Sequence, residues 1–95
     1  MKMLPNQVKI KKNVIYEKVY QDLIGNDVKT IGYCDSATKH LYIKLGLSKL
    51  LEKDTEAHEL LHAICDEYKI KINHSELDKL ATALVRVFML NKWIK

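Results

Sequence analysis

Two amphipathic helical segments joined by a short connection constrain the fold of this 95-residue chain more than any other feature. No Gly or Pro interrupts residues 56–68, and apolar residues recur there with the spacing of one helical face. A second set recurs in the same way and consists of Leu77, Leu80, Ala81, Leu84, Val85 and Phe88. Because only residues 69–73 connect the two segments, the helices must be antiparallel neighbours or cross at an angle.

The first segment shows where its helix begins and which face it buries. Asp54 and Thr55 are both residue types that cap helix N-termini, so we expect the helix to begin there. Ser48 is another candidate cap, from which a helical turn precedes this helix or joins it. Glu59 and Asp66 are expected on the side opposite the apolar stripe. That stripe consists of Ala57, Leu60, Leu61, Ile64, Cys65 and Tyr68.

Two histidines, His58 and His62, lie at the border of that stripe, and Glu59 follows the first of them. Side chains four residues apart on a helix lie one turn apart on the same face, so both imidazoles can bind one metal ion. A glutamate in this position can act as the general base that takes a proton from a metal-activated water molecule. The alternative is that both are ordinary histidines hydrogen-bonded to their neighbours.

A catalytic zinc ion normally has three protein ligands and one open position, so a third ligand has to come from another segment. Glu76, His74 and Asp78, near the start of the second helix, are the candidates. Glu76 is also suited to a capping box with Asn73, three residues before it. Asp78 lies on the other edge of the apolar stripe and is a candidate for orienting a metal-bound histidine. The alternative for His74 is an exposed loop residue.

The N-terminal half has strand character. Apolar and β-branched residues gather at residues 7–10, 14–19, 30–34 and 40–45, and residues 22–28 are expected to form an irregular loop. Residues 31–45 read as a hairpin whose second strand alternates, with Leu41, Ile43 and Leu45 on one face and His40, Tyr42 and Lys44 on the other. The expected fold class is α+β, a small antiparallel sheet of three to four strands packed on the histidine helix and a C-terminal helix.

Polar side chains of this hairpin are candidates for a role at the metal. If the second strand lies at the edge of the sheet, its free backbone groups can bind an extended peptide by strand addition. Tyr42 and His40, together with Tyr33 on the first strand, are then candidates for stabilising an oxyanion at the metal. The alternative for each is an aromatic residue of the core or surface with no catalytic part.

Length and composition limit the remaining choices. We expect residues 1–95 to form a single domain with a modest core. No apolar run is long enough to span a membrane or to act as a signal peptide, so we expect no membrane partner and a cytoplasmic location. Cys34 and Cys65 are expected to be free thiols in that compartment. Cys65 is expected in the core, with metal binding beside His62 as the alternative.

The net charge of +4 comes mainly from scattered lysines, with a cluster at Lys9, Lys11, Lys12 and Lys18. Such a cluster can attract an acidic partner, but it is also typical of a solvated strand that discourages association between sheets. Arg86 is the only arginine, and no helix-turn-helix or zinc-finger pattern occurs. These observations argue against a nucleic-acid partner.

Two stretches together resemble a known family. His58-Glu-Leu-Leu-His62-Ala-Ile, followed by Glu76-Leu-Asp78-Lys-Leu-Ala81-Thr-Ala-Leu84, resembles the minimal gluzincin-type zinc metallopeptidases, which include small phage-encoded proteins, and the ImmA/IrrE-type peptidases. The resemblance covers about residues 55–88. It implies that His58, His62 and Glu76 are the zinc ligands and that Glu59 is the general base. The chain departs from the larger relatives in carrying Asp78 where they often have Asn, and in the short spacing from His62 to Glu76.

The leading hypothesis is therefore a zinc metalloendopeptidase that hydrolyses a protein or peptide substrate, with Glu59 as the general base. A different class is a small, phage-type protein-interaction module in which zinc is structural or absent. In a third hypothesis the enzyme is autoinhibited, with the N-terminal segment or the tail around Trp93 covering the metal.

Overall fold

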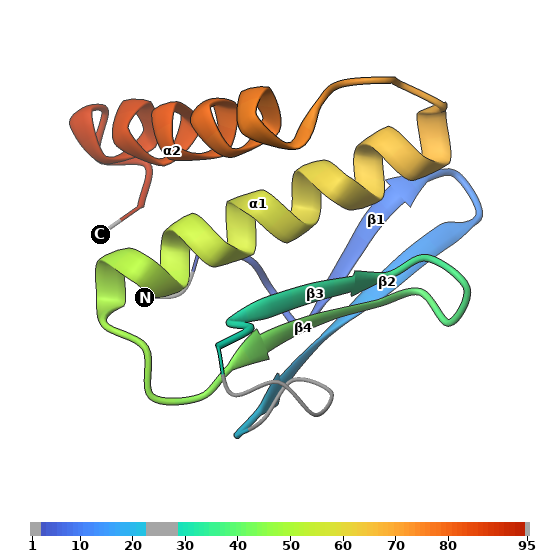
Figure 1. Ribbon diagram of the computed structural model, residues 1–95, viewed down its shortest axis with the longest axis horizontal. Coiled ribbons are helices and arrows are strands. Elements are labelled where there is room, and N and C mark those ends of the chain that lie inside the picture. Colours follow the sequence, from blue (N-terminus) through green and yellow to red (C-terminus); the bar gives the residue numbers. More distant parts are fainter. Residues whose placement is uncertain (1–2, 23–28, 95) are drawn as a thin grey trace.

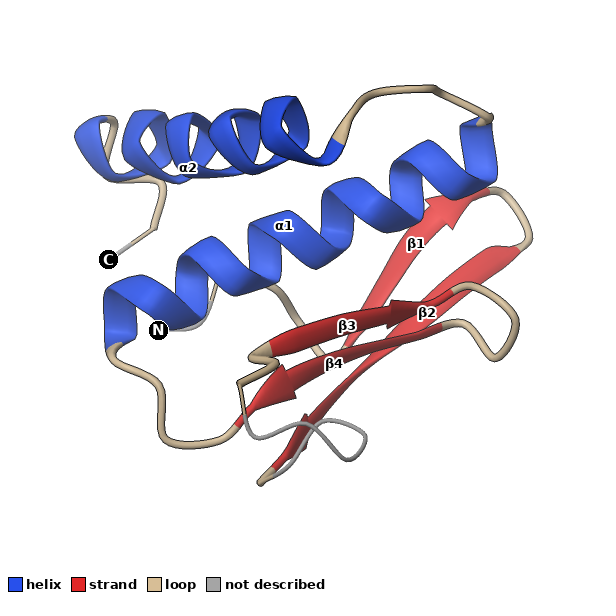
Figure 2. Ribbon diagram, viewed as in Figure 1, coloured by secondary structure: helices blue, strands red, loops and turns tan. Residues whose placement is uncertain are grey.

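The computed structural model describes residues 3–22 and 29–94, and it has the expected α+β class. Its elements are β1 (Gln7–Lys11), β2 (Val14–Gln21), β3 (Gly32–Asp35), β4 (His40–Lys44), α1 (Lys49–Tyr68) and α2 (His74–Leu90). They form three layers, with the sheet on one side, α1 in the middle and α2 outermost (Figure 1). Helix α1 therefore packs on the sheet with one face and on α2 with another (Figure 2).

The sheet is mixed, with the strand order β1-β2-β4-β3. β1 pairs with β2 and β3 pairs with β4 in antiparallel fashion, whereas β2 and β4 run parallel. The expected hairpin of residues 31–45 is confirmed as β3 and β4, but its second strand lies inside the sheet. This second strand, β4, carries two fully buried residues, Leu41 and Ile43, and lies under α1. The edge position that we considered for residues 40–45 is taken by β3 instead.

Apolar side chains fill the spaces on both sides of α1. Between the sheet and α1 lie Tyr16, Leu41 and Ala63, and between the two helices lie Ala57, Ala81, Val85 and Ile94. The alternation predicted for residues 40–45 holds within β4, whereas Leu45 lies beyond the strand and is exposed. Helix α1 is therefore held in place by two separate apolar clusters.

Helix α1 begins earlier than Asp54 and Thr55 indicated. Its N-cap is Ser48, whose hydroxyl accepts a hydrogen bond from the backbone N–H of Leu51 at 3.3 Å. Asp54 instead binds Arg86 of α2 with both carboxylate oxygens, at 2.9 and 3.2 Å. The Thr55 hydroxyl donates to the carbonyl of Leu51. The predicted cap at residues 54 and 55 is wrong, because these polar groups find partners inside the helix and on α2.

Because α1 lies between two layers, it carries buried charged side chains. Glu56 is fully buried, and it accepts hydrogen bonds from Lys18 Nζ at 2.9 Å and from the Tyr20 hydroxyl at 3.0 Å. Glu59 is 6% exposed. The expectation that Glu59 lies on the solvent side of α1 is therefore wrong. A helix covered on two faces has no single apolar stripe, and Tyr68, expected in that stripe, is half-exposed.

Some expectations for the N-terminal half also need correction. Lys18, assigned to a solvated lysine cluster, is buried at Glu56. The irregular loop expected at residues 22–28 lies, from residue 23 onward, outside the described residues. Within the described ranges, neither helix is long and apolar enough to cross a membrane.

Candidate metal centre

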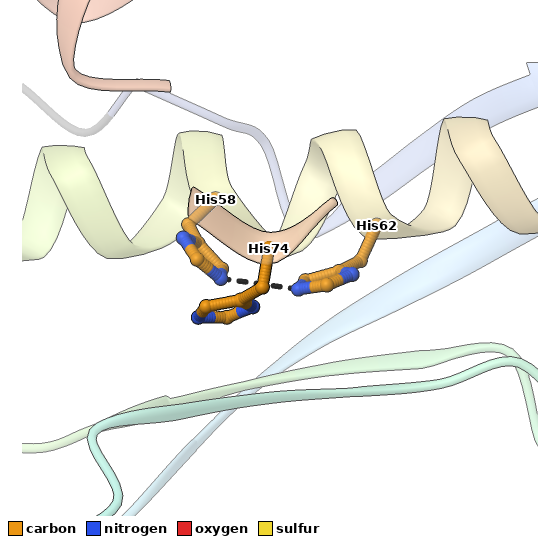
Figure 3. A group of neighbouring side chains, drawn as sticks. All are labelled: His58, His62 and His74. Atoms are coloured by element: carbon orange, nitrogen blue, oxygen red, sulfur yellow. Dashed lines mark hydrogen bonds between the residues drawn. The ribbon is translucent and has the colours of Figure 1, made fainter. Parts of the chain in front are cut away.

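Three histidines gather between α1 and the start of α2. His58 and His62 project from one face of α1, and His74 is the first residue of α2 (Figure 3). The Nε2 atoms of His58 and His62 lie 3.1 Å apart. One ring nitrogen from each of the three histidines lies within 4.8 Å of the other two. The cluster can therefore hold a metal ion.

The turn between the helices brings His74 to this position. Lys69 ends α1 in the left-handed conformation, with φ 55°, and its backbone N–H donates to the carbonyl of Cys65. Asn73 then caps α2 by accepting a hydrogen bond from the backbone N–H of Glu76. The first turn of α2 thus returns along α1, which places its first side chain opposite the middle of that helix (Figure 3).

The spacing of the nitrogens fits zinc. Zinc–nitrogen distances of about 2.0–2.1 Å place two ligands of a tetrahedral site roughly 3.3 Å apart. The 3.1 Å between His58 and His62 matches this value. His74 has to move by at most about 1.5 Å to match it, which side-chain rotation provides. Burial, aided by the neighbouring imidazoles, lowers the pKa of His58 and of His62, and so favours the neutral form that binds metals.

Asp78 lies where an orienting carboxylate is expected. Its Oδ1 is 3.3 Å from Nδ1 of His58, whereas Nε2 of the same ring faces His62. A carboxylate on the outer nitrogen fixes the orientation of the ring and leaves the inner nitrogen for a metal.

Glu76 does not join the cluster. Its Oε1 accepts a hydrogen bond from Nδ2 of Asn73 at 2.5 Å, and its backbone N–H donates to Oδ1 of Asn73 at 2.8 Å. Asn73 and Glu76 thus pair much as the alternative supposed, but this is only half of a capping box, because Glu76 bonds the side-chain amide of Asn73 and not its backbone N–H. The side chain grouped with His58 and His62 is His74, another of the expected candidates for third ligand, and not Glu76.

Glu59 lies between α1 and the edge strand β3. A Cβ atom on Gly32 would lie 2.7 Å from Oε2 of Glu59 and 2.6 Å from Cγ2 of Thr55, so only glycine allows this close approach. Burial raises the pKa of Glu59 from its ordinary value of 4.5 to about 7. No hydrogen bond or ion pair to this carboxylate occurs among the described residues.

Two of the three candidates for oxyanion stabilisation, His40 and Tyr42, lie on the other face of the sheet, whereas Tyr33 lines a hollow beside the histidines. Leu41 and Ile43 turn toward α1, so His40 and Tyr42, which alternate with them, turn away. Tyr42 stacks on Tyr33 at 6.3 Å and on His40 at 5.7 Å between ring centroids. The expected role of Tyr42 and His40 at the metal is corrected, because the sheet separates both side chains from the three histidines.

The segments considered as covers of the metal lie elsewhere. Trp93 packs edge-on against Phe88, near the C-terminal end of α2, whereas His74 is at its N-terminal end. Leu4 in the N-terminal segment contacts Glu56 and Lys18. Among the described residues, neither segment lines the hollows beside the histidines.

Three hollows adjoin the histidines. The first, of about 230 Å³, lies between the cluster and β3 and is lined by Gly32, Tyr33, Cys34, Glu59 and Asp66 together with all three histidines. The second, of about 460 Å³, extends from Glu59 toward Asp78 and Thr82. The third, of about 570 Å³, opens at the turn between the helices and includes His62 and His74. The ring nitrogens thus face space in which a substrate can bind.

Sequence reasoning missed two residues of this region. Gly32 brings β3 against α1, and its only signal was a glycine inside a strand, which often marks a close backbone approach. Cys34 lines the 230 Å³ hollow, and nothing in its sequence context indicated this position. Burial raises the pKa of the Cys34 thiol to about 12, which keeps it protonated in the metal-free protein.

Comparisons with known proteins gave no match to a protein-family model, to a curated protein or to a solved structure.

Proposed function

We propose that this protein is a zinc-dependent peptidase. The observation that carries the proposal is Glu59, which is 6% exposed, has no hydrogen bond or ion pair among the described residues and shares a hollow with three histidines. Three imidazoles with one open position are a common catalytic ligand set for zinc. The proposal retains the activity implied by the resemblance to gluzincin-type metallopeptidases, but takes His74 in place of Glu76 as the third ligand.

The three histidines, Glu59, Asp78 and the edge strand β3 each have a part in this proposal. His58, His62 and His74 would hold the zinc ion, which would supply Lewis-acid chemistry by lowering the pKa of a water molecule and polarising a peptide carbonyl. Glu59 accepts the proton of the attacking water and delivers it to the leaving amine. Asp78 keeps the ring of His58 in its binding orientation. The edge strand β3 borders the hollow, and its outer backbone groups are available to an extended peptide.

A second candidate function is favoured by Cys34. A thiolate in addition to three imidazoles would fill all four positions of a tetrahedral site, as in structural zinc centres. In that case the protein is a small interaction module and zinc only stabilises its fold. The position of Cys34 in the hollow shared by the three histidines is the observation behind this candidate.

Zinc titration of variants tests the ligand set. We expect one zinc ion per chain in the wild type and at least about tenfold weaker binding in His74→Ala, because a ligand is lost. Glu76→Gln is the matched control, since the glutamine carbonyl can still accept the hydrogen bond from Nδ2 of Asn73, and it should retain wild-type affinity. Weaker binding in Glu76→Gln with unchanged binding in His74→Ala would contradict the assignment of His74.

Cleavage of denatured casein, followed by mass spectrometry, tests the activity. The zinc-loaded wild type should produce peptides, whereas Glu59→Gln should bind zinc and lose cleavage by at least about a hundredfold. Cys34→Ala separates the two candidate functions, because it leaves a catalytic site intact but removes a ligand from a structural one. Undiminished cleavage in Glu59→Gln, or no zinc-dependent cleavage in the wild type, would overturn the peptidase proposal.

A further inference from the structure

Helix α2 has an outward side that no other element covers. It forms the outermost layer, and among the described helices and strands only α1 packs against it (Figure 1). Leu80, Ala83, Val87 and Leu90 lie on this outward side, and we call these four residues the outer stripe. Leu80, Val87 and Leu90 are 49%, 46% and 82% exposed. The outer stripe is thus a second apolar face of α2, in addition to the one that packs on α1.

The spacing within the outer stripe is that of a row of side chains between two helices. Its members follow one another at intervals of three, four and three residues. Alternating intervals of three and four keep side chains in one narrow row along a helix, and such a row packs against a matching row of a second helix. A helix that lies on a lipid surface has a charged side opposite its apolar one, whereas α2 packs on α1 with the opposite side. The outer stripe therefore fits one further helix.

The two ends of the outer stripe carry opposite charges. Glu76 lies one turn before Leu80 on the same side of α2, and Lys92 follows Leu90 at the other end. Neither Glu76 nor Lys92 forms an ion pair among the described residues. The hydrogen bond from the neutral side chain of Asn73 leaves the charge of Glu76 in place. Both charges are therefore available to a partner that presents the opposite order.

A second copy in antiparallel orientation presents that order together with a matching stripe. When Leu80 of one copy packs on Leu90 of the other, Ala83 comes opposite Val87, so a small side chain meets a larger one. The same contacts recur on the other side of a two-fold axis, because this register is symmetric. The outer stripe is therefore self-complementary, as a two-fold dimer requires.

The charges agree with the same register. Glu76 of each copy comes to the end of the other copy's helix, near Lys92. Lys79, beside the outer stripe, comes opposite the neutral Asn91, and Arg86 is already paired within its own chain. Antiparallel packing also opposes the two helix dipoles, whereas parallel packing of two copies brings Glu76 to Glu76 and Lys92 to Lys92.

We propose that the outer stripe binds the outer stripe of a second copy, so that two chains form an antiparallel, two-fold symmetric dimer through α2. This interface needs neither a metal ion nor the peptidase function. It lies beside the candidate metal centre, because Glu76 also lines the hollow of about 570 Å³ that includes His62 and His74. The C-terminal end of α2 from the second copy therefore borders that hollow.

The area of the outer stripe indicates a weak dimer. Its exposed side chains, with Trp93 (60% exposed) at the end of α2, form an apolar patch of about 400–500 Å² on each copy. Two such patches with their polar surroundings bury about 1,000–1,200 Å², which is the lower limit for a specific interface. We therefore expect a dissociation constant on the order of 10 µM.

Sedimentation equilibrium of the full chain measures this association. Between about 1 and 500 µM, the protein should change from mainly monomer to mainly dimer. A chain that remains monomeric up to about 500 µM overturns the proposal. If that monomer instead binds vesicles of phosphatidylcholine and phosphatidylserine, the outer stripe belongs to a membrane surface and the dimer is likewise overturned.

Substitutions in the outer stripe locate the interface. Leu80→Gln and Leu90→Gln should each weaken dimerisation by at least about tenfold, because the two-fold axis makes each substitution act twice. Ile15→Gln is the matched control, since Ile15 is 51% exposed on the face of the sheet that turns away from α1, and the dissociation constant should stay unchanged. All three side chains are exposed, so the fold of the monomer should be intact, which circular dichroism of dilute protein checks. Unchanged dimerisation in both leucine variants, or equal weakening in Ile15→Gln, overturns the assignment to α2.

A charge exchange tests the orientation. Glu76→Lys and Lys92→Glu each place like charges at both ends of the antiparallel dimer and should weaken it about tenfold at low ionic strength. The two substitutions combined restore opposite charges and should return the dissociation constant to within about threefold of the wild type. Weakening without this rescue overturns the antiparallel arrangement, and unchanged dimerisation in the single variants does so as well.

Discussion

We expect Glu59→Gln to stabilise the metal-free protein at neutral and alkaline pH but not in acid. Burial between α1 and β3 raises the pKa of Glu59 from 4.5 to about 7, because the ionised carboxylate loses its hydration there. Between these two values the folded protein holds a proton that the unfolded chain releases. The stability associated with this group is thus complete below the unfolded pKa and is lost as the pH rises through the folded pKa.

The size of the loss follows from the pKa difference. Each unit of that difference corresponds to about 1.4 kcal/mol, so ionising Glu59 in the folded protein lowers the free energy of unfolding by about 3 kcal/mol in total. Glutamine is neutral at every pH, so the variant does not lose this free energy of unfolding as the pH rises. The advantage of Glu59→Gln over the wild type should therefore grow from near zero at about pH 4 to about 3 kcal/mol at about pH 8. His58 and His62 are common to both proteins and cancel in the difference.

Urea unfolding of dialysed, metal-free protein, followed by circular dichroism at several pH values, measures this difference. Glu67→Gln is a control of opposite sign. Hydrogen bonds from Lys39 and Tyr16 lower the pKa of Glu67, so the stability that it contributes is present at neutral pH and lost on acidification. A difference between Glu59→Gln and wild type that stays constant from acid to alkaline pH would refute the desolvated position of Glu59.

Three further substitutions test the packing around the centre by urea unfolding. Lys18→Met leaves the fully buried Glu56 without its cation and should cost about 3–5 kcal/mol; a loss below about 1 kcal/mol would argue that water reaches the pair. Gly32→Ala places a Cβ 2.6 Å from Cγ2 of Thr55 and should cost about 1–3 kcal/mol, whereas no loss would show that β3 can move away from α1. Ser48→Ala should cost about 1 kcal/mol, and unchanged stability would contradict this cap.

Local patterns predicted much of the fold. The alternation at Leu41 and Ile43 identified the face of β4 that turns to α1, and the short connection at residues 69–73 required the two helices to pack together. The parallel pairing of β2 with β4 could not be read in the same way. It joins segments that are distant along the chain, and the hydrophobic pattern of a strand does not specify its neighbour. The start of α1 was misplaced because Asp54 has the residue type of a cap but is used to bind Arg86.

The candidate site was predictable where it depends on one helix. The four-residue spacing was enough to bring His58 and His62 together. Asp78 lies near His58 from the other helix, and its orienting role stays a prediction. The burial of Glu59 was not predictable, because it depends on two layers and on the absence of a side chain at Gly32. A helical wheel describes one covered face, whereas α1 has two.

In the proposed zinc site, capping at the start of α2 accounts for the choice of His74 over Glu76. The backbone N–H groups at the start of α2 need acceptors, and Asn73 caps the N–H of Glu76 while the Glu76 carboxylate accepts from the side-chain amide of Asn73. Glu76 is thereby held away from the histidines, whereas His74, at the first helical position, is free to face them. Three neutral imidazoles leave the full charge of a divalent ion uncompensated, whereas two imidazoles and a carboxylate leave only one positive charge. The buried Glu59 gains most from the first arrangement, because its ionised form then lies beside a more positive centre. The hydrogen bonds between Asn73 and Glu76 and the burial of Glu59 therefore favour the same proposed three-histidine ligand set.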